Sequence, residues 1–165
     1  MRTVIGIDPG PDKSAIVRIE DWRVVHADIL PNGEVASELV YISHARMGSL
    51  IGIEKVQSYG MAVGKEVFET CFWIGEYRRV CKDLGLNYIT LPRPEIKSKL
   101  CHSAKAKDAN VRQALIDLLG PPGTKKNPGP TYGVKSHCWA ALAVAVIADV
   151  TDRRVELDTV EIRVA

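Results

Sequence analysis

The chain has 165 residues, of which 46% are hydrophobic and 25% are charged, and this suits a globular domain with its own core. No apolar run reaches the roughly 18 residues of a membrane-spanning helix, so no membrane partner is expected. The 22 basic and 20 acidic residues leave a formal net charge of +2, which by itself neither indicates nor excludes a nucleic-acid partner.

The first residues and the cysteines bear on the compartment. The chain opens on a strand pattern, so no signal peptide is expected. The four cysteines, Cys71, Cys81, Cys101 and Cys138, form no C-x-x-C pair, which predicts reduced thiols in a cytosol-like compartment. A zinc site that uses them with His102 and His137 is the weaker alternative, because the spacing matches no usual zinc pattern.

The first element is a short apolar strand that runs into Asp8 and the turn Pro9-Gly10. A continuous apolar run is typical of a central strand that is covered on both faces of a sheet. A carboxylate at the end of such a strand is desolvated unless a positive charge meets it, and a metal ion is the usual partner. Asp-Pro-Gly is also common turn chemistry, so this stretch alone leaves a site and a plain turn equally open.

Two more strands, over 13–18 and 22–29, follow across short polar turns and predict an antiparallel meander. The spacing of apolar residues then predicts a helix over 34–47. The next apolar run, over 49–56, again ends in a carboxylate, Glu54. An acid at the end of two different strands favours a site over two unrelated turns.

The second half of the chain is mostly helical. The pattern predicts one strand over 86–91 and helices over 63–84, 95–101, 109–119 and 135–150. The long helix is expected to face the core with Val67, Cys71 and Ile74, and Asp108 is expected to cap the helix that follows it. A loop rich in Pro and Gly, 120–133, precedes the last helix, whose alanines allow close contact with the sheet.

The order of the elements indicates one α/β domain with a mixed sheet over 1–152. No repeat, low-complexity segment or linker divides it. The segment 153–165 alternates apolar and polar residues with one slip, so it is expected to be a C-terminal arm or an edge strand.

Three residues far apart in the sequence are candidates for one site. Asp8 ends the first strand, Glu54 ends the fourth, and His137 begins the last helix. If the two strands are neighbours, both carboxylates emerge at one edge of the sheet, where the start of the helix can add its imidazole. Two carboxylates and an imidazole suit Mg²⁺ or Mn²⁺. Two such ions would activate a water and stabilise the leaving oxygen of a phosphodiester.

At these residues the sequence resembles the RuvC-type Holliday junction resolvases of the ribonuclease H-like (retroviral integrase) superfamily, and within them a phage or viral branch. The resemblance spans about 1–149 and rests on four pieces in order: Gly6–Gly10, Ile53–Val56, Ala106–Val111 and Ser136–Ala143. It implies a ribonuclease H-like fold with a mixed five-stranded sheet, three antiparallel strands followed by two parallel ones, flanked by helices.

The resemblance also implies roles for individual residues. Asp8 and Glu54 are the expected metal ligands, and His137 stands where members carry Asp or His. Lys107, which lies in the third matching piece, is the candidate for a lysine near the scissile phosphate. These four are the predicted catalytic residues.

The chain departs from the family at two places. One helical turn after the histidine, where the family usually has a further Asp, this chain has Ala140. The site is then expected to be weaker, to rely on the histidine and water, or to be impaired, unless Asp12 or Asp108 reaches it. Similar resolvases also carry an aromatic just past the second acid. Here that place is Gln57, and Tyr59 is the nearest aromatic.

Basic side chains gather in the third quarter of the chain and just beyond it. Contacts to phosphates need such side chains, so we predict a DNA-binding face, with an ordinary solvated lysine surface as the alternative. The predicted DNA-binding residues are Lys105, Lys107, Arg112, Lys125, Lys126 and Lys135, together with Gln57 and Tyr59.

The resemblance therefore implies a nuclease of DNA recombination and repair that cuts branched double-stranded DNA with one or two Mg²⁺ or Mn²⁺ ions. A homodimer is expected because a symmetric junction needs two cuts. The alternatives are a junction-binding protein with weak catalysis, and, less favoured, a small protein with an ATPase fold. The expected location is the cytoplasm of a bacterium, with the protein encoded by the cell or by a phage.

Overall fold

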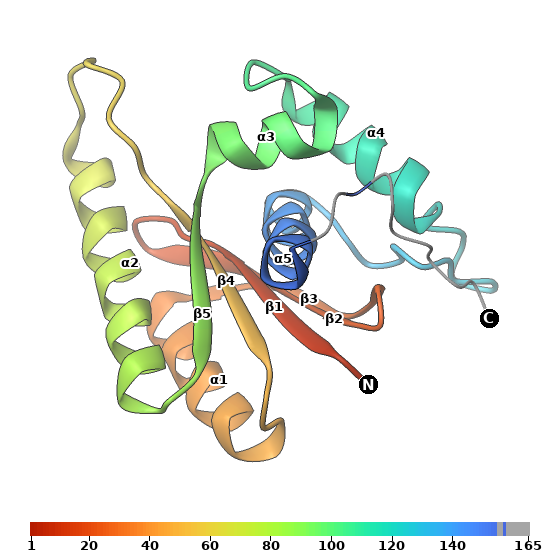
Figure 1. Cartoon of the computed structure of the whole chain (residues 1–165), viewed down its shortest axis with the longest axis horizontal. Coiled ribbons are helices and arrows are strands. Elements are labelled where there is room, and N and C mark those ends of the chain that lie inside the picture. The colour runs from red at the N-terminus through yellow and green to blue at the C-terminus, as the bar shows by residue number, and fades with distance from the viewer. Residues whose placement is uncertain (155–156, 158–165) are drawn as a thin grey trace.

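A mixed sheet lies between two layers of helices in the structure, a computed structural model that describes residues 1–154 and 157 (Figure 1). In this part of the chain the strands are β1 (Thr3–Asp8), β2 (Lys13–Glu20), β3 (Arg23–Pro31), β4 (Leu50–Lys55) and β5 (Asn87–Pro92). The helices are α1 (Asn32–Ala45), α2 (Lys65–Asp83), α3 (Arg93–Cys101), α4 (Asp108–Leu119) and α5 (Cys138–Arg153).

The sheet has the order β3-β2-β1-β4-β5. Its pairings are antiparallel from β3 to β1 and parallel from β1 to β5, which confirms the predicted three antiparallel and two parallel strands. α3, α4 and α5 cover one face, and α1 and α2 cover the other. β1 and β4 therefore have apolar neighbours on both faces, which explains their continuous apolar sequences.

α5 packs directly on β1 and β4 because two glycines leave room for its backbone. A Cβ at Gly6 would stand 2.0 Å from the carbonyl oxygen of Ala141, and a Cβ at Gly52 would stand 2.8 Å from the Cβ of Ala148. No side chain larger than hydrogen fits at either strand position without moving the helix. This close packing fixes the start of α5, where His137 lies, above the edge of the sheet.

α2 turns Ile74 to the core as the sequence suggested, but another predicted residue faces solvent. Its buried residues include Ile74 and Tyr77, whereas Cys71 is exposed, so the prediction for Cys71 is wrong. The hydroxyl of Tyr77 finds buried polar partners in Ser14 and Asn32, and this lets an amphipathic side chain take the inner position.

Several boundaries also differ from the prediction. α4 begins at Asp108 with Lys107 as its N-cap, and the Lys107 N–H donates to Asn110 Oδ1 at 3.0 Å, so Asp108 is not the cap. The loop 120–133 is held by its own bonds, among them Thr131 Oγ1 to the Gly120 carbonyl at 2.9 Å. The C-terminal arm or edge strand predicted for 153–165 lies almost wholly outside the described residues.

All four cysteines are free in the structure. Among the described residues, no helix combines the length and the apolar character needed to cross a bilayer.

Candidate active site

Asp8 and Glu54 leave the sheet side by side. β1 and β4 are parallel neighbours with Ile7 opposite Ile53, and the next residue of each strand is one of the two acids. Each acid stands two residues after a glycine that faces α5, so both carboxylates lie on the α5 face of the sheet. Only 14% of the Asp8 side chain and 15% of the Glu54 side chain are exposed. The structure thus brings together two of the predicted site residues.

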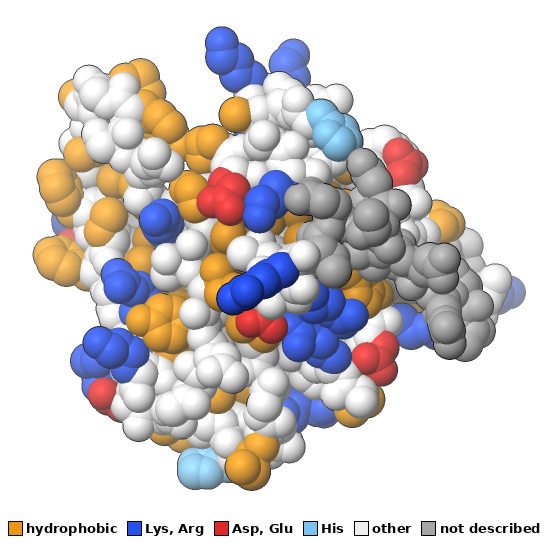
Figure 2. Space-filling view, in the orientation of Figure 1, with side chains coloured by type: hydrophobic (Ala, Val, Ile, Leu, Met, Phe, Trp, Pro, Cys, Tyr) orange, Lys and Arg blue, Asp and Glu red, His pale blue; other side chains and the backbone are white. Residues whose placement is uncertain are grey.

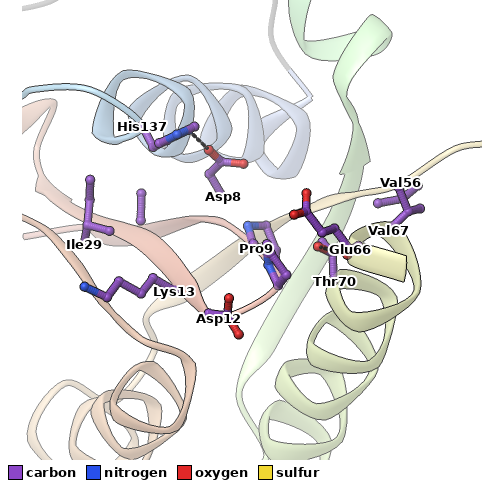
Figure 3. A pocket seen from close by; sticks show the side chains of 13 residues that line it. Asp8, Pro9, Asp12, Lys13, Ile29, Val56, Glu66, Val67, Thr70 and His137 are labelled. Atoms are coloured by element: carbon purple, nitrogen blue, oxygen red, sulfur yellow. Dashed lines mark hydrogen bonds and ion pairs between the residues drawn. The ribbon is translucent and has the colours of Figure 1, made fainter. Parts of the chain in front are cut away.

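His137 contacts one member of the pair, Asp8, from the start of α5. It precedes the first residue of α5, and its Nδ1 lies 3.4 Å from Asp8 Oδ2 (Figure 3). The imidazole is 76% exposed, so it stands at the mouth of the site with one nitrogen turned to the acid. Ser136, just before it, takes a positive φ of 48°, and this turn helps set the direction in which the chain enters α5.

Glu54 meets an arginine that the sequence analysis did not single out. Arg93 begins α3 directly after β5, and its Nη1 donates to Glu54 Oε2 at 3.1 Å and lies 3.3 Å from Oε1. Its Nη2 donates to Asp108 Oδ1 at 2.8 Å, and Lys97 Nζ lies 3.4 Å from the same oxygen. Asp108 was one of the two acids that the sequence analysis named as able to reach the site. It is linked to Glu54 through the shared guanidinium of Arg93.

Burial dominates the electrostatics of the two acids. It raises the pKa of Glu54 to about 7, the negative charge of Asp8 adds to the rise, and Arg93 opposes it. Burial also raises the pKa of Asp8, against the charges of Arg93 and His137. The hydrogen bond from Arg93 instead lowers the pKa of exposed Asp108. The buried pair is short of positive charge, and the chemistry of its oxygens suits a hard divalent cation.

The side chains as they stand do not form a closed set of metal ligands. Over residues 1–154 and 157, no three His, Cys, Asp or Glu side chains are grouped so that they could hold a metal ion. In the predicted triad, His137 contacts Asp8 while Glu54 contacts Arg93. The zinc alternative gains no support from the positions of the cysteines and histidines.

A cleft of about 670 Å³ opens beside Asp8, between the turn after β1 and the start of α2 (Figure 3). Asp12, the other acid that the sequence left open, lines it. So does Glu66 in the first turn of α2, which sequence reasoning missed. Acidic residues are common in the first turn of a helix because they stabilise the helix itself. The sequence therefore carried no signal for a site at this residue.

A buried polar cluster holds the turn that follows Asp8. Ser14 Oγ donates to Asn32 Oδ1 at 2.6 Å, and the Tyr77 hydroxyl lies 2.9 Å from Ser14 Oγ. The cluster reaches the turn because Asn32 Nδ2 donates to the Gly10 carbonyl at 3.0 Å and the Gly10 N–H donates to Ser14 Oγ at 3.3 Å. The end of β1 is thereby tied to β2, α1 and α2.

The predicted DNA-binding residues are all exposed, but they fall into separate regions. Lys107 directly precedes Asp108, Lys135 lies two residues before His137, and the Arg112 guanidinium lies 5.1 Å from the centre of the Trp139 ring. Figure 2 shows Lys and Arg side chains standing out from the connection between α3 and α4. The remaining residues lie on other loops. Lys125 and Lys126 lie between α4 and α5, and Gln57 and Tyr59 lie between β4 and α2.

Neither the protein-family models nor the curated proteins that were compared with the sequence match it. Solved structures do match. A RuvC structure from Thermus thermophilus has a TM-score of 0.70 and 18% identity, over 92% of this chain and 96% of that one. RuvC of the same organism in complex with a Holliday junction substrate has a TM-score of 0.71 and 18% identity, over 93% and 96%. The chain therefore has the fold of these RuvC structures.

Proposed function

We propose that the chain is a metal-dependent endonuclease that resolves four-way DNA junctions. The observation that carries the proposal is the pair of buried carboxylates, Asp8 and Glu54, side by side at the carboxyl ends of β1 and β4 in a RuvC fold. Solved RuvC has been found with a Holliday junction substrate, which makes branched DNA the first substrate class to test.

The residues of the site have different proposed roles, which follow from their positions. Asp8 and Glu54 hold Mg²⁺ or Mn²⁺, and His137 adds a neutral nitrogen, which suits Mn²⁺ better than Mg²⁺. A divalent ion at such a site supplies positive charge to the phosphate and makes water a stronger nucleophile at neutral pH. Lys107, exposed beside Asp108, is in position to contact a phosphate near the site.

Binding to DNA rests on basic side chains around the site. Lys105, Lys107 and Lys135 lie on the two segments that lead into α4 and α5, and Arg112 lies in the second turn of α4. Contacts of this kind depend on the release of counterions, so junction affinity should fall steeply as salt is raised. Gln57 and Tyr59, exposed on the loop after β4, are the candidates for contact with the junction centre.

A homodimer fits both the substrate and the surface. Two cuts on a symmetric junction require two sites related by a two-fold axis. Large apolar side chains lie exposed on the outer side of α2 and the loop before it, among them Phe68, Phe72, which is 71% exposed, and Met61 (Figure 2). Such a patch on one helix is well suited to pack against its own copy.

The cytoplasm of a bacterium is the proposed location, whether the chain is encoded by the cell or by a phage. Free cysteines, one of them exposed Cys71, suit a reducing compartment, and branched DNA arises there.

The direct test is a labelled four-way junction incubated with the protein and Mn²⁺ or Mg²⁺. We expect symmetric cuts by the wild type, faster with Mn²⁺, and none by Asp8→Asn. Full cleavage by Asp8→Asn would refute the role of the carboxylate pair. Tight junction binding with no cleavage under any metal would favour a binding protein, the reading that Ala140 in place of the family's further Asp supports.

A further inference from the structure

A basic residue, Arg93, lies beside Ala140, the position at which the resemblance led us to expect a further carboxylate. A second, smaller cavity of about 160 Å³ lies beside Ala140 and is lined by Arg93, Asp108 and His137 among others. The methyl group of Ala140 leaves this space open, and the guanidinium of Arg93 borders it. The positive charge therefore stands on the side of Glu54 where the resembling family usually offers another metal ligand.

Arg93 is held in a defined place. Its Nη1 contacts both oxygens of Glu54, and its Nη2 contacts Asp108. The residue starts α3, and Glu54 pairs with Leu91 in the strand that leads into it, so the register of β4 and β5 sets the approach. A lysine in this position would not bridge the two carboxylates, because it lacks the planar fork of a guanidinium.

The guanidinium also retains capacity for a further anion. Arginine has five N–H donors, and the contacts to Glu54 and Asp108 engage only part of them. The Arg93 side chain is 36% exposed, and it borders the cavity beside His137, so an entering phosphate oxygen can reach it.

The local charge balance favours one divalent ion. The carboxylates of Asp8, Glu54 and Asp108 exceed the charges of Arg93 and Lys97 by one, with His137 left out of the sum. One divalent ion leaves the cluster with a single positive charge opposite the phosphate. A second ion would leave three positive charges in the same small space, next to a guanidinium that already engages Glu54.

We propose that Arg93 takes the place of a second metal ion: it neutralises Glu54 and contacts the scissile phosphate, so that each protomer works with one divalent cation. This inference rests on the proposed nuclease function and deepens it by assigning a catalytic residue. Arg93 does for the phosphate by hydrogen bonds and charge what a second cation would do by coordination.

The test combines calorimetry of Mn²⁺ binding without DNA and cleavage of a labelled junction. We expect one Mn²⁺ per protomer for the wild type. Arg93→Gln should bind Mn²⁺ about tenfold more tightly, because a competing charge is gone, yet cleave about 10²-fold more slowly. Arg93→Lys should keep the single ion and recover part of the rate. Arg79→Gln, on the exposed side of α2, is the matched control and should change neither quantity.

A rescue makes the test specific. In the double variant Arg93→Gln/Ala140→Asp, the restored carboxylate should bring the count to two Mn²⁺ per protomer and raise cleavage at least tenfold over Arg93→Gln. Two ions or none bound by the wild type, or wild-type cleavage by Arg93→Gln, would overturn the proposal. If the wild type cuts no junction at all, the proposed function fails, while the ion count still decides whether Arg93 excludes a second cation.

Discussion

The two ends of β1 and α5 carry buried acids with opposite surroundings. At one end, Glu54 of β4 pairs with Arg93, whose charge also acts on Asp8 of β1, and Asp8 contacts His137 just before α5. At the other end, Asp149 of α5 is 1% exposed and is paired with two arginines, Arg2 just before β1 and Arg153 one turn further along the helix. One end thus has an acid with ample positive charge, and the other end has a pair of acids, on β1 and β4, with too little.

The difference separates a structural ion pair from a candidate site. An acid with two arginine partners has its desolvation offset within the fold, so it has no need of an external ion. A buried carboxylate pair with one arginine on only one of its two acids is costly to ionise, and a cation that comes from outside would relieve this cost. The acids at both ends are buried, so burial does not distinguish them. The number of positively charged partners does.

The largest expected effect comes from Asp8→Asn. Cleavage should fall by about 10³-fold or more, since a ligand for the cation is lost. The metal-free protein should become more stable, because a buried charge is removed. Junction cleavage and thermal unfolding in EDTA measure the two effects, and a loss of both activity and stability would make Asp8 a structural residue like Asp149.

The second effect is a pH dependence that arises at the carboxylate pair. Because burial raises the pKa of Glu54 to about 7, the folded state holds a proton that the unfolded state gives up at lower pH. The metal-free protein should therefore lose stability as pH rises from about 4.5 to 7, while Mn²⁺ affinity should rise up to about tenfold per pH unit over the range approaching 7. Glu54→Gln should flatten the stability curve, and an unchanged curve would show that the titrating group lies elsewhere.

The third prediction concerns the other end. Asp149→Asn removes the charge that joins Arg2 to Arg153, so the free energy of unfolding should drop by about 2 kcal/mol. Cleavage at a temperature where the variant is folded should stay at the wild-type level. Urea unfolding and a junction assay at low temperature test this, and a stable but inactive variant would contradict the separation of the two ends.

The smallest effect is expected at the polar cluster behind Asp8. Tyr77→Phe deletes the hydroxyl that contacts Ser14 and Asn32, which should cost about 1 kcal/mol and slow cleavage a few-fold through the Gly10 turn. The matched control Tyr41→Phe, on the exposed side of α1, should change stability by less than about 0.5 kcal/mol. Equal effects from the two variants would show that the buried polar cluster does not support the site.

Much of the fold was predictable because its elements are encoded locally. The apolar runs that end in Asp8 and Glu54 predicted two central strands, and their parallel pairing brings the acids together as expected. His137 at the start of the last helix was found in the same way. Each of these residues can be located from the sequence because it lies at the end of a predicted strand or at the start of a predicted helix.

The rest of the site could not be derived because it depends on contacts between elements. Arg93 reaches Glu54 only through the register of β4 with β5, and Asp108, predicted as a helix cap, turns to the same arginine. A basic residue directly after a parallel strand next to Glu54 was the one available signal. Tyr77 was missed because helical spacing alone does not show that a hydroxyl has buried partners.

The most direct test of the central claim is the anomalous signal of Mn²⁺ diffused into crystals of the protein. A peak in contact with Asp8 and Glu54, at the carboxyl ends of β1 and β4, is the predicted result. A crystal with no peak at this edge, or with Mn²⁺ bound at another group of acids while Asp8 and Glu54 keep only protein partners, would contradict it.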